Sequence, residues 1–454
     1  MTIDAPTAPT TPILRRHVTG TIRAGVEELG GRPSMVVRSV SAVRRGALSI
    51  EDGETMRAAA DSALTLRIPV VLVLASSGAD VSEGVASLHG WGQAARALSR
   101  CSGVVPFIVV VTGPAISGPA LLLGLADLVV MTSDAYAFVS GPAMVEEFTG
   151  VRIGIHQLGG TAMHARSSGL CAIEAGSEEN ALAHVDHLLG LLPAHQDELP
   201  PLVETGRAEH EVDELREIIP GQTTSSYDVR RVLAALADDH EVTELWTRWS
   251  PQLVTGLGRI GGRPVGFVAN QPQALAGTLD IAASQKGARF VRFCDAFNLP
   301  LVTLVDTPGF LPGKDLEWRG MIRHGAELAF AYAEATVPRV CVILRKAYGG
   351  AYIVMDSKGL GNDLCFAWPG AEIAVMGAEG AVQILHRRAL PEEREGLQAE
   401  YTERFLTPYE ASERGFVDAV IDPSSTRSVV TEALTTLATA KEMLPGRKHT
   451  LGPL

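Results

Sequence analysis

The stretch Val111-Thr112-Gly113-Pro114-Ala115-Ile116-Ser117-Gly118-Pro119-Ala120 follows an apolar run and leads into another, Leu121 to Leu125. A second stretch of the same kind, Leu344-Arg345-Lys346-Ala347-Tyr348-Gly349-Gly350-Ala351-Tyr352, follows the apolar residues 340–344. Each pattern predicts a buried strand, a turn of small residues and the start of a helix. The first N–H groups of a helix have no partner within it, so such a turn can stabilise an oxyanion. Two such turns indicate two copies of one catalytic scaffold, fused head to tail.

A short phrase repeats at the same point of both halves and supports this duplication. Gly30-Gly31-Arg32-Pro33 begins the first half, and Gly261-Gly262-Arg263-Pro264 begins the second. After each phrase, apolar runs of strand length alternate with helical patterns. Strands are predicted at 69–75, 107–111, 128–131, 264–269, 301–305, 340–344 and 373–376, and helices at 53–66, 85–98, 279–297, 321–334 and 378–388. The alternation predicts an α/β fold with two related domains.

Length and composition divide the chain further. Its 454 residues exceed one ordinary domain, and its 46 glycines suit an α/β protein with many tight turns. We expect a disordered arm, rich in Pro and Thr, at 1–16. The proline-rich and acidic segment 187–226 is predicted to contain the boundary, so that the two domains span 17–224 and 225–454.

Charge and cysteine content argue against several classes of protein. A net charge of −13 argues against a nucleic-acid surface and against binding to an anionic membrane. The uncharged segment 103–125 is long enough to span a bilayer, but prolines and glycines interrupt it, so a buried strand and helix are predicted instead. The five cysteines form no C-x-x-C pattern and no secretion signal is evident. We therefore expect reduced thiols, no metal in this chain and a cytoplasmic location.

The second half contains a long series of phrases that belong together. They are GFVANQP at 266–272, ARFVRFCDAFN at 288–298, DTPGFLPG at 306–313, AYAEATVP at 331–338, RKAYGGAY at 345–352 and AEIAVMG at 371–377. This series closely resembles the carboxyltransferase (β) subunit of biotin-dependent acyl-CoA carboxylases, of the propionyl-CoA carboxylase type. The resemblance implies two fused crotonase-like domains of the ClpP/crotonase superfamily. It also implies a homohexamer whose active sites lie between the N-domain of one subunit and the C-domain of another.

The resemblance implies an enzyme that moves CO₂ from carboxybiotin to the α-carbon of an acyl-CoA or a related acyl thioester. The sequence has no Met-Lys-Met biotinylation site and no ATP-grasp signature. Biotin is therefore expected on a separate carrier protein, with a biotin carboxylase/biotin carrier subunit as partner. In this reaction the thioester oxygen becomes negative in an enolate, and the departing biotin develops negative charge on its ureido oxygen. Two oxyanion holes would suit these two charges without any side-chain nucleophile.

The resemblance also indicates which residues form the two sites. Those of the C-domain are Gly350 and Ala351 as the oxyanion hole, with Gly349, Tyr352, Ile353, Gly309 and Phe310 lining the pocket. Those of the N-domain are Ser117 and Gly118 as the hole, with Pro119, Gly78 and Ala79 as binding residues. The N-domain hole is expected on the acyl-thioester side, although the two ligands could be exchanged.

The first half departs from the family at its turn. The usual Gly-Gly-Ala is Ser117-Gly118-Pro119 here, and proline has no N–H to donate. Asp80 stands where the family has an arginine. In the second half Ile353 follows Tyr352 where an aspartate is common, so the acyl pocket is predicted to be more apolar.

These departures leave two alternatives to an acyl-CoA carboxylase subunit. One is a biotin-independent decarboxylase or carboxyltransferase that acts on an unusual or carrier-bound thioester, whose activity would persist with avidin present. The other is a degenerate, non-catalytic β subunit used for assembly, which would co-purify with an intact homologue and be inert alone.

Overall fold

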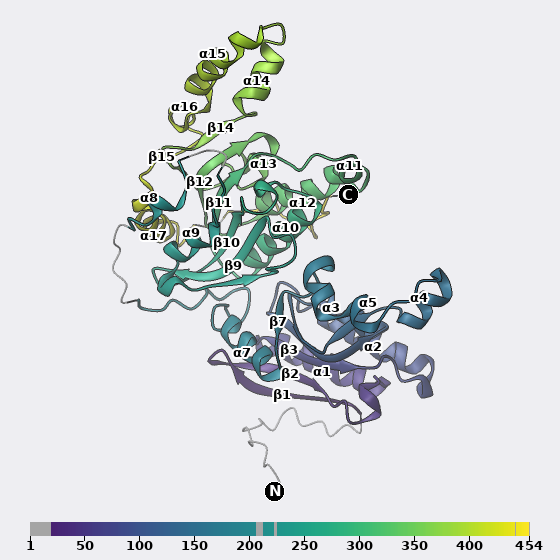
Figure 1. Ribbon diagram of the computed structural model, residues 1–454. Coiled ribbons are helices and arrows are strands. Elements are labelled where there is room, and N and C mark those ends of the chain that lie inside the picture. Colours follow the sequence, from purple (N-terminus) through teal and green to yellow (C-terminus); the bar gives the residue numbers. More distant parts are fainter. Residues whose placement is uncertain (1–19, 206–211, 222–224, 441, 454) are drawn as a thin grey trace. The chain divides into compact units, whose positions relative to one another are not determined.

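The computed structural model describes residues 20–205, 212–221, 225–440 and 442–453. The chain divides into two compact units, Met1–Pro201 (unit 1) and Leu202–Leu454 (unit 2), which are described one at a time (Figure 1). The arm expected at 1–16 lies outside the described residues.

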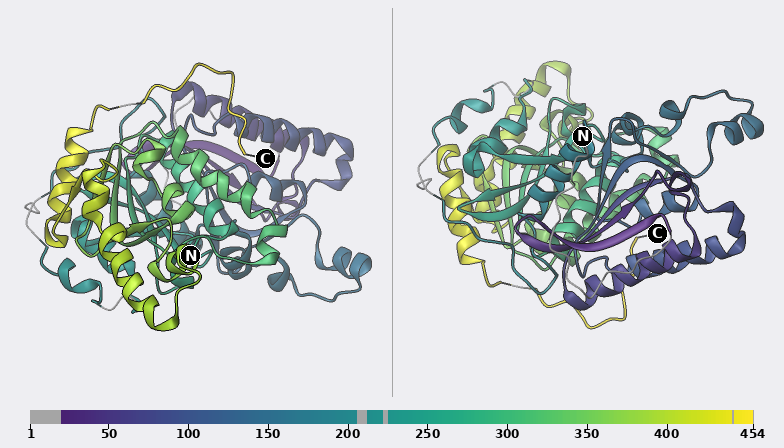
Figure 2. Two further views of the ribbon diagram at one scale, coloured as in Figure 1. Left: turned by 90° about the horizontal axis from the view of Figure 1, so that it is seen from above. Right: turned by 90° about the horizontal axis from the view of Figure 1, so that it is seen from below.

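Unit 1 is built on a sheet of strand order β1-β2-β3-β4-β5-β7, with β6 paired to β4. β1 and β2 pair antiparallel, and the other pairs are parallel. Its strands are β1 (Ile22–Leu29), β2 (Arg32–Ser39), β3 (Val70–Ser76), β4 (Phe107–Ile116), β5 (Leu128–Thr132), β6 (Tyr136–Phe138) and β7 (Ile173–Ala175). Its helices are α1 (Ile50–Leu66), α2 (Val85–Ser99), α3 (Gly118–Leu123), α4 (Pro142–Thr149), α5 (Ile155–Gly159), α6 (Thr161–Met163) and α7 (Glu178–Leu189). The long helices α1 and α2 run side by side along the sheet (Figure 2).

Unit 2 repeats this plan with a sheet of order β15-β13-β12-β11-β10-β9-β8, in which β14 pairs with β12. Its strands are β8 (Val242–Leu245), β9 (Leu253–Ile260), β10 (Arg263–Asn270), β11 (Leu301–Thr307), β12 (Arg339–Tyr348), β13 (Leu364–Ala367), β14 (Glu372–Ala374) and β15 (Ala419–Val420). Its helices are α8 (Leu215–Ile218), α9 (Val229–Leu236), α10 (Ile281–Ala296), α11 (Lys314–Trp318), α12 (Met321–Glu334), α13 (Gly349–Val354), α14 (Ala378–Leu385), α15 (Pro391–Tyr401), α16 (Pro408–Glu413) and α17 (Thr426–Thr436). Helices α14 and α15 stand off from the sheet as a hairpin (Figure 1).

The repeated phrase forms the same turn in both units. It joins β1 to β2 in unit 1 and β9 to β10 in unit 2, each time as a two-residue hairpin. Gly30 and Gly31 have φ of 60° and 71°, and Gly261 and Gly262 have φ of 57° and 76°. Two successive positive φ angles define the tight hairpin turn that glycine favours. The predicted duplication is therefore visible in the backbone.

The strands and helices lie close to where the sequence placed them. The inner strands β3 and β11 are buried along their whole length and mostly apolar, as is typical of parallel strands. The uncharged segment 103–125 contains β4 and the short helix α3, as predicted. Among the described helices, none combines the length and the hydropathy that a membrane span requires.

The boundary between the two compact units follows Pro201, earlier in the chain than the position expected at 224/225. The described part of the intervening segment packs with unit 2, where the Val203 N–H donates to the Gly262 carbonyl (3.0 Å). Leu215 and Ile218 of α8 are buried in the core of unit 2. Prolines and acidic residues gave this segment the composition of a linker, but its few apolar residues attach it to the second core.

Unit 2 contains a fully buried lysine. Lys286 lies on α10, and its Nζ donates to the carbonyls of Trp246 (2.9 Å) and Trp249 (3.0 Å). Trp246 and Ser250 have positive φ angles of 55° and 49°, so the ammonium group ties down a strained turn before β9. Burial lowers the pKa of Lys286 to about 7, because the charged form is poorly solvated there.

This lowered pKa predicts a specific pH dependence. Between about pH 7 and pH 10 the unfolded chain binds a proton at Lys286 that the native chain has released, so stability should rise with pH over this range. From pH 7 to pH 9 the free energy of unfolding should rise by on the order of 1–2 kcal/mol more in the wild type than in Lys286→Met. Urea unfolding at both pH values measures this difference, and equal changes in the two proteins would contradict it.

Candidate active site

The predicted turn of unit 2 lies at the end of a central parallel strand. β12 ends at Tyr348, and α13 begins at once with Gly349, whose φ is +60°. No side chain caps this helix. The N–H groups of Gly350 and Ala351 therefore belong to the first turn, where the helix gives them no partner, whereas the Gly349 N–H faces the paired strand β14.

A second backbone segment comes to the same place from β11. Leu279 donates its N–H to the Gly309 carbonyl (3.2 Å) and accepts the N–H of Leu311 (2.8 Å). In this parallel bridge the N–H of Phe310 points away from Leu279, toward the side on which β12 neighbours β11. A Cβ built on Gly350 would lie 3.6 Å from the Phe310 ring. The loop after β11 and the start of α13 are thus adjacent.

The α13 turn opens onto a largely apolar cavity of about 520 Å³. Among its lining residues are four predicted ones, Gly349, Gly350, Tyr352 and Ile353. The others are Ile373, Ala374, Val375, Tyr401, Phe405, Glu410, Ala411, Arg414 and Phe416. The Ile353 side chain is partly exposed, whereas Ala351 is fully buried under the turn. The arrangement combines free backbone N–H groups with an apolar recess.

Unit 1 has the corresponding turn with different chemistry. Ser117 has φ 62° and ψ −132°, in the place that Gly349 occupies in unit 2. Its own N–H donates to the Phe138 carbonyl (3.0 Å), and the Ala120 N–H donates to the Ser117 carbonyl (3.0 Å). Since Pro119 has no N–H, the Gly118 N–H is the one donor of this turn without a structural role.

The loop after β3 in unit 1 matches the loop after β11 in unit 2. Leu48 bridges to Ala79 as Leu279 bridges to Phe310. Gly78 has φ +115°, and a Cβ built on it would lie 3.9 Å from the Ser117 Cβ. The structure therefore brings Gly78-Ala79 together with Ser117-Gly118-Pro119.

Two neighbouring side chains restrict the turn of unit 1. A Cβ at Gly118 would lie 2.7 Å from the indole nitrogen of Trp91, so no residue larger than glycine fits. Asp80, which replaces the family's arginine, forms an ion pair with Arg44 and accepts hydrogen bonds from Ser82. The Ser82 hydrogen bonds lower the pKa of Asp80, and Arg44 lowers it further. The carboxylate is therefore held within unit 1 by local partners.

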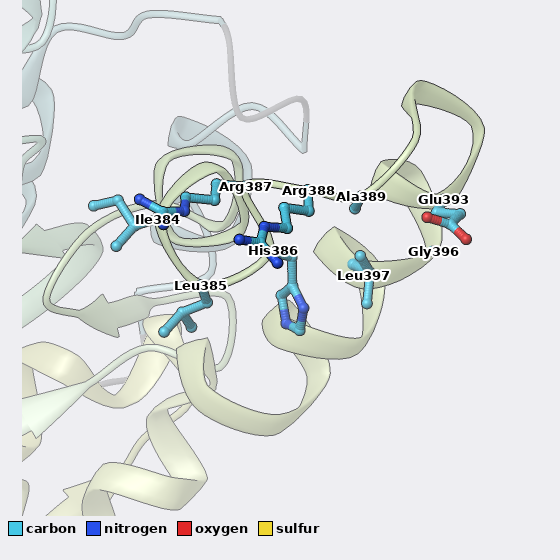
Figure 3. A pocket seen from close by; sticks show the side chains of 9 residues that line it. All are labelled: Ile384, Leu385, His386, Arg387, Arg388, Ala389, Glu393, Gly396 and Leu397. Carbon is cyan, nitrogen blue, oxygen red and sulfur yellow. The ribbon is translucent and has the colours of Figure 1, made fainter.

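A larger cavity of about 820 Å³ lies between α14 and α15 (Figure 3). It is lined by Ile384, Leu385, His386, Arg387, Arg388, Ala389, Glu393, Gly396 and Leu397. It contains none of the predicted residues and no backbone turn of the kind described above. The smaller cavity is the better candidate for an active site in unit 2, because N–H groups at the start of α13 adjoin its largely apolar surface.

Three aromatic residues of the cavity were not predicted. Tyr401 and Phe405 lie at the end of the α15 segment with ring centroids 5.1 Å apart, and Phe416 follows α16. The spacing of four residues between Tyr401 and Phe405 places them on one helical face, which was a usable signal. No pattern in the sequence linked that face to a turn some fifty residues earlier. Within the described residues, no group of three His, Cys, Asp or Glu side chains could hold a metal ion.

Two α/β units that each present backbone N–H groups at the end of a parallel strand define an enzyme of the crotonase-like class. Comparison with known proteins identifies the family. The model of the carboxyl transferase domain matches residues 9–451, so the chain belongs to that family and is a carboxyltransferase. The predicted fold of two fused crotonase-like domains is confirmed.

The similarity extends over most of the chain. The propionyl-CoA carboxylase carboxyltransferase subunit of Haloferax mediterranei is 44% identical over 95% of this chain and 85% of its own. The methylmalonyl-CoA decarboxylase subunit alpha of Veillonella parvula is 43% identical over 86% of this chain and 77% of its own. A crystal structure of transcarboxylase 12S, described as a hexamer with methylmalonyl-coenzyme A and methylmalonic acid bound, has a TM-score of 0.94 at 40% identity. It covers 96% of this chain and 85% of its own.

The positive φ at both turns predicts opposite effects of exchanging serine and glycine. Ser117→Gly should keep or raise stability, by up to about 1 kcal/mol, because glycine adopts this backbone conformation without strain. Gly349→Ser should lower stability by about 1–3 kcal/mol, because its Cβ would lie 3.1 Å from the Val375 carbonyl oxygen at φ +60°. Thermal unfolding measures both, and a stabilising Gly349→Ser would contradict the geometry.

Proposed function

We propose that this chain is the carboxyltransferase component of an acyl-CoA carboxylase. It moves a carboxyl group between biotin on a separate carrier protein and the α-carbon of an acyl-CoA or related acyl thioester. One observation carries the proposal: in a chain of the carboxyl transferase family, the Phe310 loop lies against the α13 turn, and that turn lines a largely apolar cavity.

The residues of unit 2 suit a ligand that combines an apolar ring system with a polar oxygen. The cavity has apolar walls, and the N–H groups at its edge are where such an oxygen would be bound. When bound, carboxybiotin supplies the carboxyl group. The chain's own part is to bind and orient the reactants and to donate backbone hydrogen bonds where negative charge develops. We assign Gly350 and Ala351 to this hole, with Gly349, Tyr352 and Ile353 and the Gly309-Phe310 loop around it.

The turn of unit 1 would serve the second oxyanion with fewer donors. Gly118 remains our candidate donor there, because the Ser117 N–H is bound to the Phe138 carbonyl, and Ser117, Pro119, Gly78 and Ala79 lie beside it. Losing one donor typically costs roughly 3 kcal/mol in the barrier. We infer that unit 1 makes the weaker contact with its oxyanion, and that the assignment of thioester and biotin to the two holes stays open.

The partners follow from the same proposal. The chain would act with a biotin carboxylase/biotin carrier subunit, and we propose a homohexamer, as in the transcarboxylase 12S structure. All five cysteines are buried thiols in the structure, which supports the expected cytoplasmic location.

A second candidate function is decarboxylation of a carboxyacyl-CoA. Two observations favour it: the missing donor at Pro119 and the similarity to the Veillonella parvula decarboxylase subunit. An assay in which avidin sequesters biotin separates the two reactions. Loss of thioester-dependent turnover with avidin supports carboxyl transfer, and persistent turnover supports a biotin-independent reaction.

The first test removes one backbone donor from unit 2. Ala351→Pro deletes the N–H at a helix position that tolerates proline, so turnover should fall by about 10² or more with the fold intact. The measurement is thioester-dependent decay of carboxybiotin. Ala378→Pro is the matched control, because it deletes an N–H from the first turn of α14, outside the cavity lining. Unchanged turnover in Ala351→Pro would mean that the α13 turn is structural only.

The second test concerns the acyl group. Ile353→Asp places a carboxylate at the wall of an apolar cavity, where its desolvation disfavours long apolar acyl chains. The ratio of kcat/KM for a longer acyl-CoA to that for acetyl-CoA should therefore fall by about tenfold or more. Ile384→Asp makes the same change in the α14–α15 cavity and should leave the ratio unchanged. Equal kcat/KM ratios in the wild type and in Ile353→Asp would mean that this cavity does not determine which acyl chain is accepted.

A further inference from the structure

The two strands that support the unit 2 turn are locked together by an irregularity in their pairing. Val305 of β11 pairs with Ile343 of β12, but Thr307 pairs with Ala347. Asp306 alone therefore faces three residues of β12, Leu344, Arg345 and Lys346. Such a bulge re-aims the strand end that follows it.

A buried ion pair closes this bulge. Arg345 Nε lies 3.0 Å from Asp306 Oδ2, and the Lys346 N–H donates to Asp306 Oδ1 (3.1 Å). Asp306 is 1% exposed and Arg345 is 7% exposed. The Asp306 N–H in turn donates to the side-chain oxygen of Asn270 on β10 (3.2 Å). One carboxylate thus joins β11 to β12, and its own peptide group joins β11 to β10.

The arginine is held from its other side as well. Arg345 Nη1 donates to the Ser225 carbonyl (2.6 Å), and its guanidinium lies over the Tyr227 ring at 5.2 Å. With one N–H on the carboxylate, one on a carbonyl and an aromatic face beneath it, the guanidinium has a single orientation.

The pair lies a few residues before both segments of the proposed oxyanion hole. Phe310 follows Asp306 by four residues, and Gly350 follows Lys346 by four residues. A shift of the bulge would move the two segments relative to each other. Donors of this kind have to meet the oxygen within a few tenths of an ångström to be effective.

Unit 1 forms the same bulge without any charge. There Leu74 pairs with Val111 and Ser76 with Ala115, so that Ala75 faces Thr112, Gly113 and Pro114. A Cβ at Gly113 would lie 3.2 Å from the Ala75 Cβ, so close packing takes the place of the ion pair. Pro114 also lacks the N–H that Lys346 gives to Asp306. The bulge can therefore form without the pair.

We propose that Asp306 and Arg345 are positioning residues for the oxyanion hole of unit 2. They hold the Phe310 loop and the α13 turn at a fixed separation. This inference rests on the proposed function, because it gives the pair a role in carboxyl transfer rather than in folding alone.

The test compares two buried ion pairs of unit 2. Asp306→Asn removes the charge but keeps the size and an acceptor for the Lys346 N–H. Asp238→Asn is the matched control, because Asp238 is a buried partner of Arg427 and binds the Gly261-Gly262 hairpin at the opposite end of β10. Both changes should lower the melting temperature. Below that temperature, Asp306→Asn should lower kcat by about tenfold or more with KM within about twofold, and Asp238→Asn should leave both within about twofold.

Two further measurements keep the result clear. The double variant Asp306→Asn/Arg345→Gln should recover part of the lost kcat, because no buried guanidinium is then left without a partner. If Asp306→Asn does not fold, Arg345→Lys can be used instead. It keeps the charge and should lower kcat in the same direction, but by less. Hydrogen–deuterium exchange, which does not depend on activity, should rise over 307–312 and 346–352 in Asp306→Asn and stay unchanged there in Asp238→Asn.

The outcomes separate this inference from the proposed function. If the wild type shows no carboxyl transfer but Asp306→Asn shows the expected exchange pattern, the proposed function is wrong. The ion pair would then still be shown to hold the two backbone segments in place. An active wild type, with unchanged kcat and unchanged exchange in Asp306→Asn, would overturn the inference and leave the function intact.

Discussion

The site depends on one constraint, which is the way a buried carboxylate fixes the ends of two parallel strands. Asp306 binds Arg345 and the backbone of Lys346, and this contact sets where β11 and β12 stop being regular strands. The two segments to which we assign the oxyanion hole lie within a few residues of that point: the Gly309-Phe310 loop on one side and the α13 turn on the other. The reaction that we propose needs no nucleophilic side chain, so it would depend on accurate placement of backbone donors.

The comparison of the two units shows which backbone features the fold requires and which side chains can vary on them. Both units have the hairpin at the repeated phrase, the bulge and the glycine-containing turn, so these belong to the fold. The chemistry placed on them differs. Unit 2 has an ion pair, a glycine at the positive φ and a full set of donors, whereas unit 1 has Ala75 and Gly113, a strained Ser117 and a proline in the turn. We infer from this difference that unit 2 stabilises its oxyanion more strongly than unit 1 does.

Much of the fold could be predicted from the sequence, because the apolar runs of 301–305 and 340–344 are long and the small-residue turns follow them directly. The family resemblance then led to Gly349, Gly350, Tyr352 and Ile353, which do line one cavity. The limits have physical causes. β12 continues to Tyr348, past the predicted end at 344, because a bulge lets polar Arg345 and Lys346 stay in the strand. The partner of Arg345 depends on that bulge, which no local pattern reveals. The boundary after Pro201 depends on the burial of Leu215 and Ile218, which tertiary contacts decide and composition does not.

In the proposed reaction, a substrate oxygen is bound by backbone N–H groups of unit 2. The most direct test is a crystal structure of the wild type soaked with free biotin and an acyl-CoA. We expect a carbonyl oxygen of one ligand at about 2.7–3.1 Å from the N atoms of Phe310 and of Gly350 or Ala351. Ligands that leave these N atoms unoccupied and bind instead between α14 and α15, at His386 and the neighbouring arginines, would contradict it.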